Sequence, residues 1–283
     1  MTRDEVLSLY LEQRDISADS SLIIYDENGT DAAAVADFMK SKGVKDIKLF
    51  DAKKWDGDVV QYADFTRWIP APVLKDIIDG KEVAELPGLS NPIILNVNWG
   101  PEKESGYLDG HIPGSIHVNS DDFDNEDKAY ILDSDETLLK LAASQGITKD
   151  STVILTGDPI FTGRYATILV YLGVEKVYIM SGTLSAWTDA GFELETEAHA
   201  PKPVASFGAD KPLNPDFIDF VDEADQMVKD PQVQLVDTRT VEEFAGETSG
   251  YSYFEGKGRI DGSVSSPAGI KSSSSMLYYR NID

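Results

Sequence analysis

The sequence contains an internal repeat of a strand, a loop, a helix and a second strand. Residues 16–25 (ISADSSLIIY) match residues 147–156 (ITKDSTVILT), and each copy is a polar turn that runs into a β-branched apolar segment. A helical segment follows each copy and ends at Gly43 or Gly173, because glycine readily adopts the left-handed conformation that closes a helix. Each glycine leads into another short apolar segment. Apolar strands that alternate with helices predict an α/β fold with a mostly parallel central sheet flanked by helices.

A second element repeats further along the chain, and it consists of an apolar strand followed by a glycine-bounded turn. The paired segments are 93–97 (IILNV) with 234–238 (QLVDT), and 110–116 (GHIPGSI) with 258–264 (GRIDGSV). The later copy carries an insertion around SGYSYFEGKG. His111 and Arg259 therefore occupy the same position of the repeat.

The two repeats together predict tandem units, one complete and two partial. A complete unit has the strand-and-turn element as its front half and the strand–loop–helix–strand element as its back half. The predicted organisation is a back half over 1–66, a connector over 67–89, a complete domain over 90–197, a Pro-, Ala- and Gly-rich linker over 198–214, and a front half over 215–283. The half-units would expose strand edges, which predicts that the chain could self-associate through them.

The charge of the chain restricts its partners. The formal net charge is -25, so there is no basic surface with which to neutralise phosphates, and we expect no nucleic-acid partner. No apolar stretch approaches the ~18 residues that cross a bilayer, so we expect no membrane span. The N-terminal segment MTRDEVLSLYLEQRD lacks the apolar core of a signal peptide. This predicts a cytoplasmic protein if that N-terminus is authentic, and a periplasmic or cell-envelope protein if a signal peptide has been lost.

The chain contains no cysteine, which excludes disulfides, zinc–thiolate sites and thiol nucleophiles. Its histidines are His111, His117 and His199, and the sequence places no cluster of histidines and carboxylates at ligand spacing. We therefore expect no metal site and no cofactor. A structural role is expected for His111.

Segments of the chain resemble three sequence motifs of rhodanese domains. They are Asp237-Thr238-Arg239 with Glu242-Glu243-Phe244 for D-x-R-x-x-x-E-[FY], residues 107–117 (YLDGHIPGSIH) and 258–264 for G-[HR]-I-x-G-[AS], and residues 177–187 (VYIMSGTLSAW) for V-x-x-[LM]-x-G-G-x-x-A-W. Thr183 replaces one glycine of the last mark. The whole chain is most similar to the rhodanese-like sulfurtransferases, and within them to the three-domain bacterial thiosulfate sulfurtransferase-like proteins.

The resemblance implies a sulfurtransferase of the thiosulfate or 3-mercaptopyruvate type, in which a cysteine at the start of an active loop carries sulfur as a persulfide. Asp26 and Gly157 stand at that position in the first two units, and neither can carry sulfur. In the third unit the loop would follow Asp283. We therefore expect this chain to be inactive by itself and to be a fragment of a longer enzyme. The alternative is a non-catalytic rhodanese-like binding or scaffold module.

Two groups of residues are candidates for binding and support. Gly157, Gly163 and Arg164, at the start of a predicted helix, could bind an anion such as a small sulfur-containing substrate, although Asp158 and Pro159 oppose this. Asp237, Arg239 and Arg259 could support an active loop and its anionic substrate. Asp237 and Arg239 could instead form an ion pair that only fixes the end of a strand, and Glu243 is expected to hold local structure.

Overall fold

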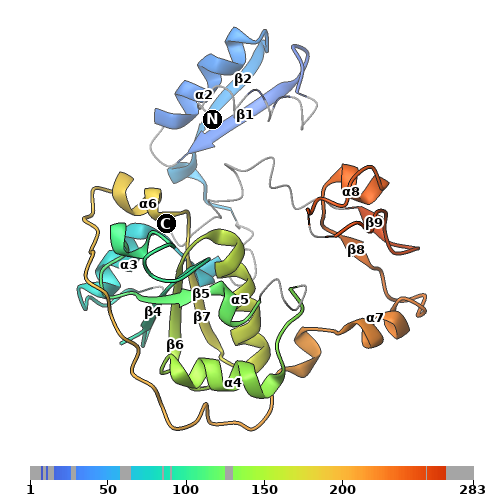
Figure 1. Cartoon of the computed structure of the whole chain (residues 1–283). Coiled ribbons are helices and arrows are strands. Elements are labelled where there is room, and N and C mark those ends of the chain that lie inside the picture. The colour runs from blue at the N-terminus through green and yellow to red at the C-terminus, as the bar shows by residue number, and fades with distance from the viewer. Residues whose placement is uncertain are drawn as a thin grey trace. The chain divides into compact units, whose positions relative to one another are not determined.

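A computed structural model of the chain is shown in Figure 1. It describes Ser8, Leu11 and residues 16–26, 30–57, 65–84, 86–89, 91–124, 130–252 and 254–265. The chain divides into two compact units, one built mainly from residues before position 63 and the other mainly from residues after it. Each unit is described by itself.

The first unit has the parallel strands and the helix that the first repeat predicted. Its elements are β1 (Ser21–Asp26), α2 (Thr30–Ser41), β2 (Asp46–Asp51) and a 3-10 turn (Ala52–Lys54). The strands β1 and β2 are parallel, and α2 packs its buried Phe38 and Met39 on one face of them. The other face exposes Ile23 and Tyr25, each more than half accessible. Self-association through this face remains a prediction.

A five-stranded parallel sheet forms the centre of the second unit. The strand order is β3-β7-β6-β4-β5. The strands are β3 (Trp68–Ile69), β4 (Ile93–Asn98), β5 (Ile116–Asn119), β6 (Thr152–Gly157) and β7 (Lys176–Met180). The helices are α3 (Ala71–Ile78), α4 (Asp135–Ser144), α5 (Pro159–Leu172) and α6 (Leu184–Asp189), with 3-10 turns at Phe65–Arg67, Tyr107–Asp109 and Ser120–Asp122.

Helices cover both faces of this sheet (Figure 1). Val153 and Leu155 of β6 pack with α4 and α5 in one core, whereas Ile154 packs with α3 and α6 in the other. Successive side chains of a strand point to opposite faces, so a strand buried on both sides must be apolar along its whole length. This is why β6 has the continuous apolar run VIL. Gly173 ends α5 with φ of 107°, as its sequence position predicted.

The central domain extends beyond both of its predicted boundaries. The segment 67–89, expected to be a connector, supplies β3 to the sheet and α3 to one core. The segment 198–214, expected to be a linker, packs against the domain through Phe207, which is buried in the other core. The backbone N–H of Lys149 donates to the carbonyl oxygen of Phe207 at 2.9 Å. The buried residues of α3 recur at helical spacing (Ala71, Leu74 and Ile77), but this period does not say which sheet the helix covers. Only packing defines where both segments belong.

The third unit of the sequence repeat belongs to the second compact unit. It repeats the strand pairing of the central domain. Its elements are a 3-10 turn (Pro215–Phe217), α7 (Val221–Met227), β8 (Val236–Asp237), α8 (Val241–Ala245) and β9 (Val264–Ser265). In the central domain Leu95 pairs with Ile116, and in the third unit Val236 pairs with Val264. The aligned sequence segments therefore have the same parallel register.

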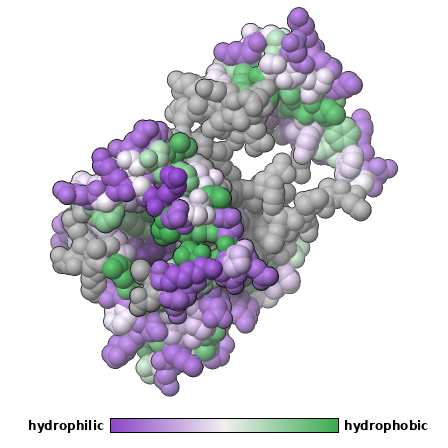
Figure 2. Space-filling model, turned by 90° about the vertical axis from the view of Figure 1, so that its right-hand side faces the viewer, coloured by the Kyte–Doolittle hydropathy of each residue, from purple (hydrophilic) through white to green (hydrophobic). Residues whose placement is uncertain are grey.

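The surface is predominantly hydrophilic in the view of Figure 2, as expected for a chain with a net charge of -25. Green hydrophobic residues are scattered among the purple ones. In the described part of the chain, no helix combines the length and the apolar character needed to cross a membrane.

Candidate active-site positions

Gly157, at the predicted nucleophile position of the central domain, lies at the end of β6 against the neighbouring strand β4. Its φ is 115°, a conformation that other residues rarely adopt. A Cβ atom built on it would lie 2.4 Å from the carbonyl oxygen of Val97 and 2.9 Å from the Val97 nitrogen. Both atoms are backbone atoms of a buried central strand, so they cannot easily move aside. This backbone therefore disfavours any side chain at position 157, including that of a cysteine.

The backbone after Gly157 turns directly into α5. At this turn the backbone N–H groups of Asp158 and Ile160 already have acceptors. The N–H of Asp158 donates to the carbonyl oxygen of Val97 at 3.1 Å and to Oδ1 of Asn98 at 2.9 Å. The carboxylate of Asp158 accepts the N–H of Ile160 at 2.8 Å and caps the helix. Pro159 has no N–H to offer. A negative side chain therefore already sits where an anion would bind.

Arg164 is paired within the central domain. Its Nε lies 2.9 Å from Oδ2 of Asp124, and its Nη2 donates to the carbonyl oxygen of Tyr130 at 3.1 Å. Burial raises the pKa of the Asp124 carboxyl, and the charge of Arg164 offsets only part of this rise. Gly163 lies inside α5 with open space around its Cβ position. Anion binding by Gly157, Gly163 and Arg164 remains a prediction, and these contacts count against it.

Asp26 lies at the end of β1, at the predicted nucleophile position of the first unit. Its Oδ2 accepts the backbone N–H of Ala32, in the first turn of α2, at 2.7 Å. A carboxylate is favourable beside the positive end of a helix dipole, so this contact stabilises the start of α2. Residues 27–29 of the predicted loop lie outside the described residues. Asp26 thus contributes to the first unit as a helix-capping group.

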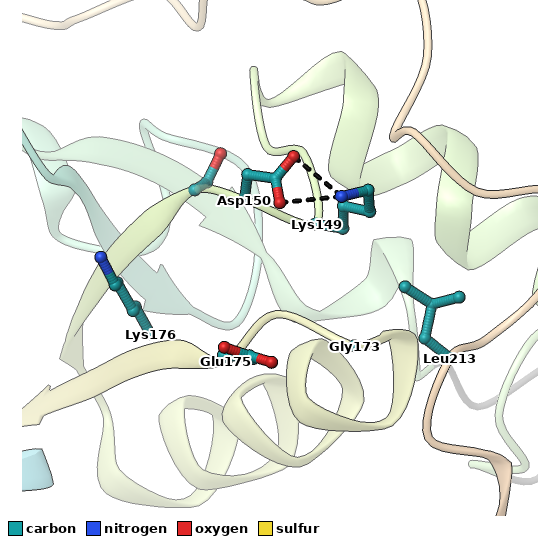
Figure 3. A pocket seen from close by; sticks show the side chains of 7 residues that line it. Lys149, Asp150, Gly173, Glu175, Lys176 and Leu213 are labelled. Carbon is teal, nitrogen blue, oxygen red and sulfur yellow. Dashed lines mark hydrogen bonds and ion pairs between the residues drawn. The ribbon is translucent and has the colours of Figure 1, made fainter.

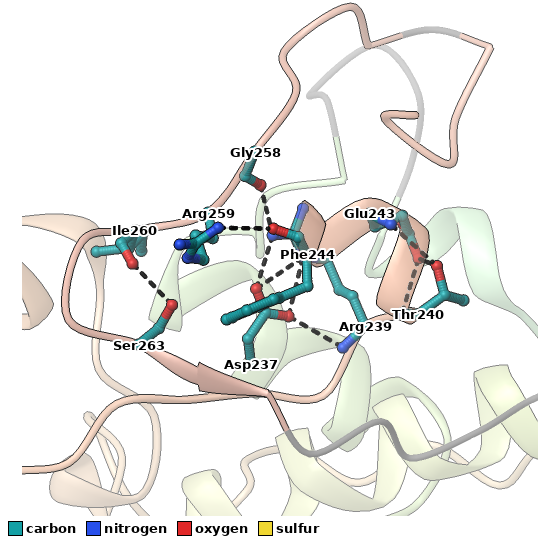
Figure 4. Close-up of polar contacts among 9 residues, drawn as sticks. All are labelled: Asp237, Arg239, Thr240, Glu243, Phe244, Gly258, Arg259, Ile260 and Ser263. Atoms are coloured by element: carbon teal, nitrogen blue, oxygen red, sulfur yellow. Dashed lines mark hydrogen bonds and ion pairs between the residues drawn. The ribbon is translucent and has the colours of Figure 1, made fainter. Parts of the chain in front are cut away.

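Asp237 and Arg239 form a forked ion pair at the end of β8 (Figure 4). The Nε of Arg239 donates to Oδ1 of Asp237 at 3.0 Å, and its Nη2 donates to Oδ2 at 2.7 Å. These hydrogen bonds lower the pKa of the Asp237 carboxyl, while burial opposes them. The same Nη2 donates to the carbonyl oxygen of Gly258 at 2.8 Å. The pair therefore joins the D-x-R segment to the G-R-I-D-G-S segment.

Arg259 and Glu243 complete this cluster. The guanidinium of Arg259 lies 4.6 Å from the ring centre of Phe244, and its Nη1 donates to the Phe244 carbonyl oxygen at 3.3 Å. Glu243 is buried, and its carboxylate accepts the N–H of Thr240 at 3.0 Å in a capping box that starts α8. Glu243 thus holds local structure, as expected.

A groove of about 520 Å³ lies beside these residues. Its charged lining residues are Asp237, Arg239, Lys257 and Arg259. Three cations face one carboxylate, so the groove is locally positive in a chain that is strongly negative overall. Sequence reasoning had not singled out Lys257, although its place two residues before Arg259 in the repeated turn was a usable signal.

The positions of the central domain that are equivalent to Asp237 and Arg239 carry no charge. The repeat aligns Asp237 with Asn96 and Arg239 with Asn98. The Nδ2 of Asn98 donates to Oδ1 of Asn96 at 2.7 Å, so an amide pair has the place of the ion pair. The central domain therefore differs from the third unit in its support residues as well as at Gly157.

A second cavity, of about 370 Å³, lies at the other end of the central sheet (Figure 3). Its lining includes Ser151 and Lys176, which lie at the starts of β6 and β7, and the ion pair of Lys149 with Asp150 at 2.8 Å. Ligands of open parallel sheets bind at the carboxyl ends of the strands. This cavity is therefore a poor candidate for the chemistry expected near Gly157.

Comparison with known proteins identifies the family. The family model of the rhodanese-like domain matches residues 74–190, which include most of the central sheet and its helices. Residues 74–190 form a rhodanese-like domain. This confirms the resemblance and the α/β fold read from the sequence. The rhodanese match begins before residue 90, in agreement with the place of α3 in the domain.

Relatives of this rhodanese-like chain include sulfurtransferases. Thiosulfate sulfurtransferase YnjE of Escherichia coli is 31% identical over 272 residues, which cover 95% of this chain and 61% of that protein. The 3-mercaptopyruvate sulfurtransferase of Escherichia coli is 26% identical over 165 residues, which cover 57% of this chain and 58% of that protein. The rhodanese-like chain thus spans about three fifths of the length of each of these relatives.

Solved structures share the fold over nearly the whole chain. Wild-type EanB has a TM-score of 0.79 and 27% identity, over 93% of this chain and 65% of that one. The anaerobic ergothioneine biosynthesis enzyme from Chlorobium limicola, in complex with trimethyl histidine, has a TM-score of 0.78 and 27% identity, over 93% of this chain and 66% of that one.

Proposed function

We propose that this chain is the cysteine-free part of a rhodanese-family sulfurtransferase of the thiosulfate or 3-mercaptopyruvate type. In this proposal, the third unit supports an active loop that lies outside these 283 residues, where we expect it to follow Asp283. The observation that carries the proposal is the Asp237–Arg239 fork beside a positive groove, at the place where the central domain has two asparagines. The names of two relatives suggest the sulfur donors.

The groove suits the chemistry of a small sulfur-containing anion. In sulfur transfer from thiosulfate, a thiolate attacks the outer sulfur, the S–S bond breaks, and sulfite leaves with the bonding electron pair. Both the donor and the attacking thiolate are anions, so neighbouring cations favour their approach. Arg259 and Lys257 supply positive charge at the groove, and Asp237 fixes the guanidinium of Arg239 in one orientation.

The central domain has a different role in this proposal. Its Gly157 position is sterically closed, and its support residues are neutral amides. We infer that it is a structural rhodanese-like domain. This closed loop also favours the second candidate function, in which the entire chain is a non-catalytic binding or scaffold module.

Thiosulfate binding to the 283-residue chain separates the two candidates. We would titrate ¹⁵N-labelled protein with sodium thiosulfate and follow the side-chain signals of arginine by NMR. The sulfurtransferase proposal predicts saturable shifts at Arg239 and Arg259, which Arg259→Gln abolishes. The matched control is Arg164→Gln, which removes the same charge at the start of α5 and should leave the shifts unchanged.

Two results would contradict the proposal. One is the absence of saturable thiosulfate binding, which favours the scaffold function. The other is binding that Arg164→Gln abolishes and Arg259→Gln preserves, which would place the anion at α5. Transfer of sulfur from thiosulfate to cyanide should be at background with this chain, because no residue of it can carry a persulfide.

A further inference from the structure

Three side chains with metal-ligating atoms lie together in the central domain. They are His111, Glu195 and His199, and one ligand atom from each lies within 4.8 Å of the other two. The first comes from the turn after Tyr107–Asp109, and the other two come from the segment after α6. Sequence reasoning expected no such cluster, because 84 residues separate His111 from Glu195 and spacing alone does not bring them together.

The backbone fixes two of these residues against each other. His111 and Glu195 form an antiparallel bridge, in which each N–H donates to the other's carbonyl oxygen at 2.9 Å. His199 follows Glu195 by four residues, and its N–H donates to the hydroxyl of Tyr107 at 3.1 Å. That hydroxyl in turn donates to the carbonyl oxygen of Ser115 at 2.7 Å. Hydrogen bonds thus hold the main chain of all three residues.

One ring nitrogen of His111 is engaged in a hydrogen bond to the backbone. Its Nδ1 lies 2.7 Å from the carbonyl oxygen of Tyr107, and because a carbonyl can only accept, Nδ1 carries the proton. In the neutral tautomer that carries this proton, Nε2 holds a lone pair. Metal-binding histidines commonly donate their second ring nitrogen to a carbonyl in this way. The Tyr107 ring stacks on the imidazole with centres 3.8 Å apart and fixes its plane.

The Nε2 atom of His111 is buried and lacks a hydrogen-bond partner within the described part of the chain. The whole side chain has no accessible surface. A buried polar atom without a partner is costly, and native proteins usually satisfy it with water, an ion or another group. This unsatisfied lone pair is an observation independent of the clustering, and it points to a ligand.

Glu195 and His199 provide the other ligand atoms. Oε2 of Glu195 accepts the N–H of Gly114 at 2.7 Å and lies 2.9 Å from Nε2 of His199. The Gly114 hydrogen bond, followed by the His199 contact, lowers the pKa of the Glu195 carboxyl. Both side chains are partly accessible, at 28% and 36%, which leaves a path for an ion from solvent.

We propose that His111, Glu195 and His199 bind a divalent transition-metal ion of the zinc type. Two imidazoles and one carboxylate suit zinc, whereas calcium and magnesium prefer oxygen ligands alone. Three protein ligands leave one position of a tetrahedral site open to water. The third unit has Arg259 at the position of His111, so this site belongs to the central domain. It is independent of the anion groove and of the sulfurtransferase proposal.

The test is zinc binding by the full chain after metal removal. We would titrate Zn²⁺ by calorimetry in excess Mg²⁺, which occupies exposed carboxylates, and record the visible absorption of bound Co²⁺. One equivalent of Zn²⁺ should bind. Glu195→Gln and His199→Ala should each weaken zinc binding by more than the roughly 10- to 100-fold that follows loss of a residue that only orients a metal ligand.

The matched control is Glu197→Gln, which removes the same charge from an exposed side chain two residues away and should bind zinc as the wild type does. His199 is partly exposed, so its replacement should leave the melting temperature in Mg²⁺ alone nearly unchanged. Equal binding by all four proteins would mean adventitious surface ions and would overturn the proposal. Absence of saturable binding by the wild type would overturn it as well, and would leave a buried water as the partner of His111.

Discussion

The carbonyl oxygen of Val97 lies 2.4 Å from the point that a Cβ atom on Gly157 would occupy. Side chains essentially never approach a backbone oxygen so closely, so the strand β4 closes the nucleophile position of the central domain. The lack of a cysteine there is built into the backbone of two neighbouring strands. A single substitution should therefore fail to convert this rhodanese-like domain into a sulfurtransferase.

The first prediction concerns Gly157→Cys. The positive φ costs about 1–2 kcal/mol for any side chain, and the clash with Val97 adds about 1–3 kcal/mol of overpacking. We expect the variant to unfold at lower urea concentration than the wild type and to show no sulfur transfer from thiosulfate to cyanide. Urea unfolding followed by circular dichroism and a thiocyanate assay measure these outcomes.

Gly163→Ala is the control for Gly157→Cys. Gly163 lies inside α5 with nothing near its Cβ position, so alanine should stabilise the helix by about 0.5–1 kcal/mol. The steric explanation would be wrong if Gly157→Cys were as stable as the wild type, or if it formed a persulfide with thiosulfate.

The second prediction concerns the cap of α5. Asp158→Ala removes the carboxylate that accepts the Ile160 N–H, and it should lower the free energy of unfolding by about 1 kcal/mol. Asp158→Asn keeps an acceptor oxygen at the same place and should lower it by much less. Thermal melts of both variants give the comparison. Equal losses in the two variants would mean that the charge of Asp158, and not its hydrogen bond, stabilises the helix.

The third prediction concerns the ion pair of Arg164 with Asp124. Arg164→Met leaves the mostly buried carboxylate of Asp124 without its cation, which should destabilise the domain by about 1–3 kcal/mol. Adding Asp124→Asn removes the stranded charge, so the double variant should recover part of this loss. A double-mutant cycle in urea measures the coupling. Additive losses would show that the two side chains do not interact.

The fourth prediction concerns acid titration of Asp237. Its pKa lies below 3.8 in the folded state because Arg239 donates to the carboxylate. A lowered pKa contributes stability above the unfolded value, and this contribution is lost as pH falls from about 4 through the folded pKa. ¹³C NMR of the side-chain carboxyl group should show its midpoint below 3.8.

Arg239→Gln should raise the midpoint of Asp237 toward 3.8. Arg259→Gln is the control, because Arg259 contacts Phe244 and is not among the groups that shift Asp237. In the Arg259→Gln variant, the titration midpoint of Asp237 should match that of the wild type. A midpoint that Arg239→Gln leaves in place would show that the fork does not set the pKa.

Local features of the chain were readable from the sequence. The turn-and-strand copies at 16–25 and 147–156 gave β1 and β6 their positions, because a polar turn before β-branched residues is a property of neighbouring residues. The same holds for the helix end at Gly173, and the absence of cysteine needs no structure. The paired turns of the second repeat even predicted that β4–β5 and β8–β9 are equivalent pairs.

Tertiary structure decided the features that join distant residues. β3 is only two residues long, and its pairing with β7, more than 100 residues away, leaves no local pattern to detect. The contact of Gly157 with Val97 arises because two strands lie side by side in the sheet. The convergence of His111 with Glu195 and His199 depends on a bridge between a turn and the segment after α6. Hydrogen-bond patterns and hydrophobic periods act over a few residues, whereas these approaches depend on how the whole domain packs.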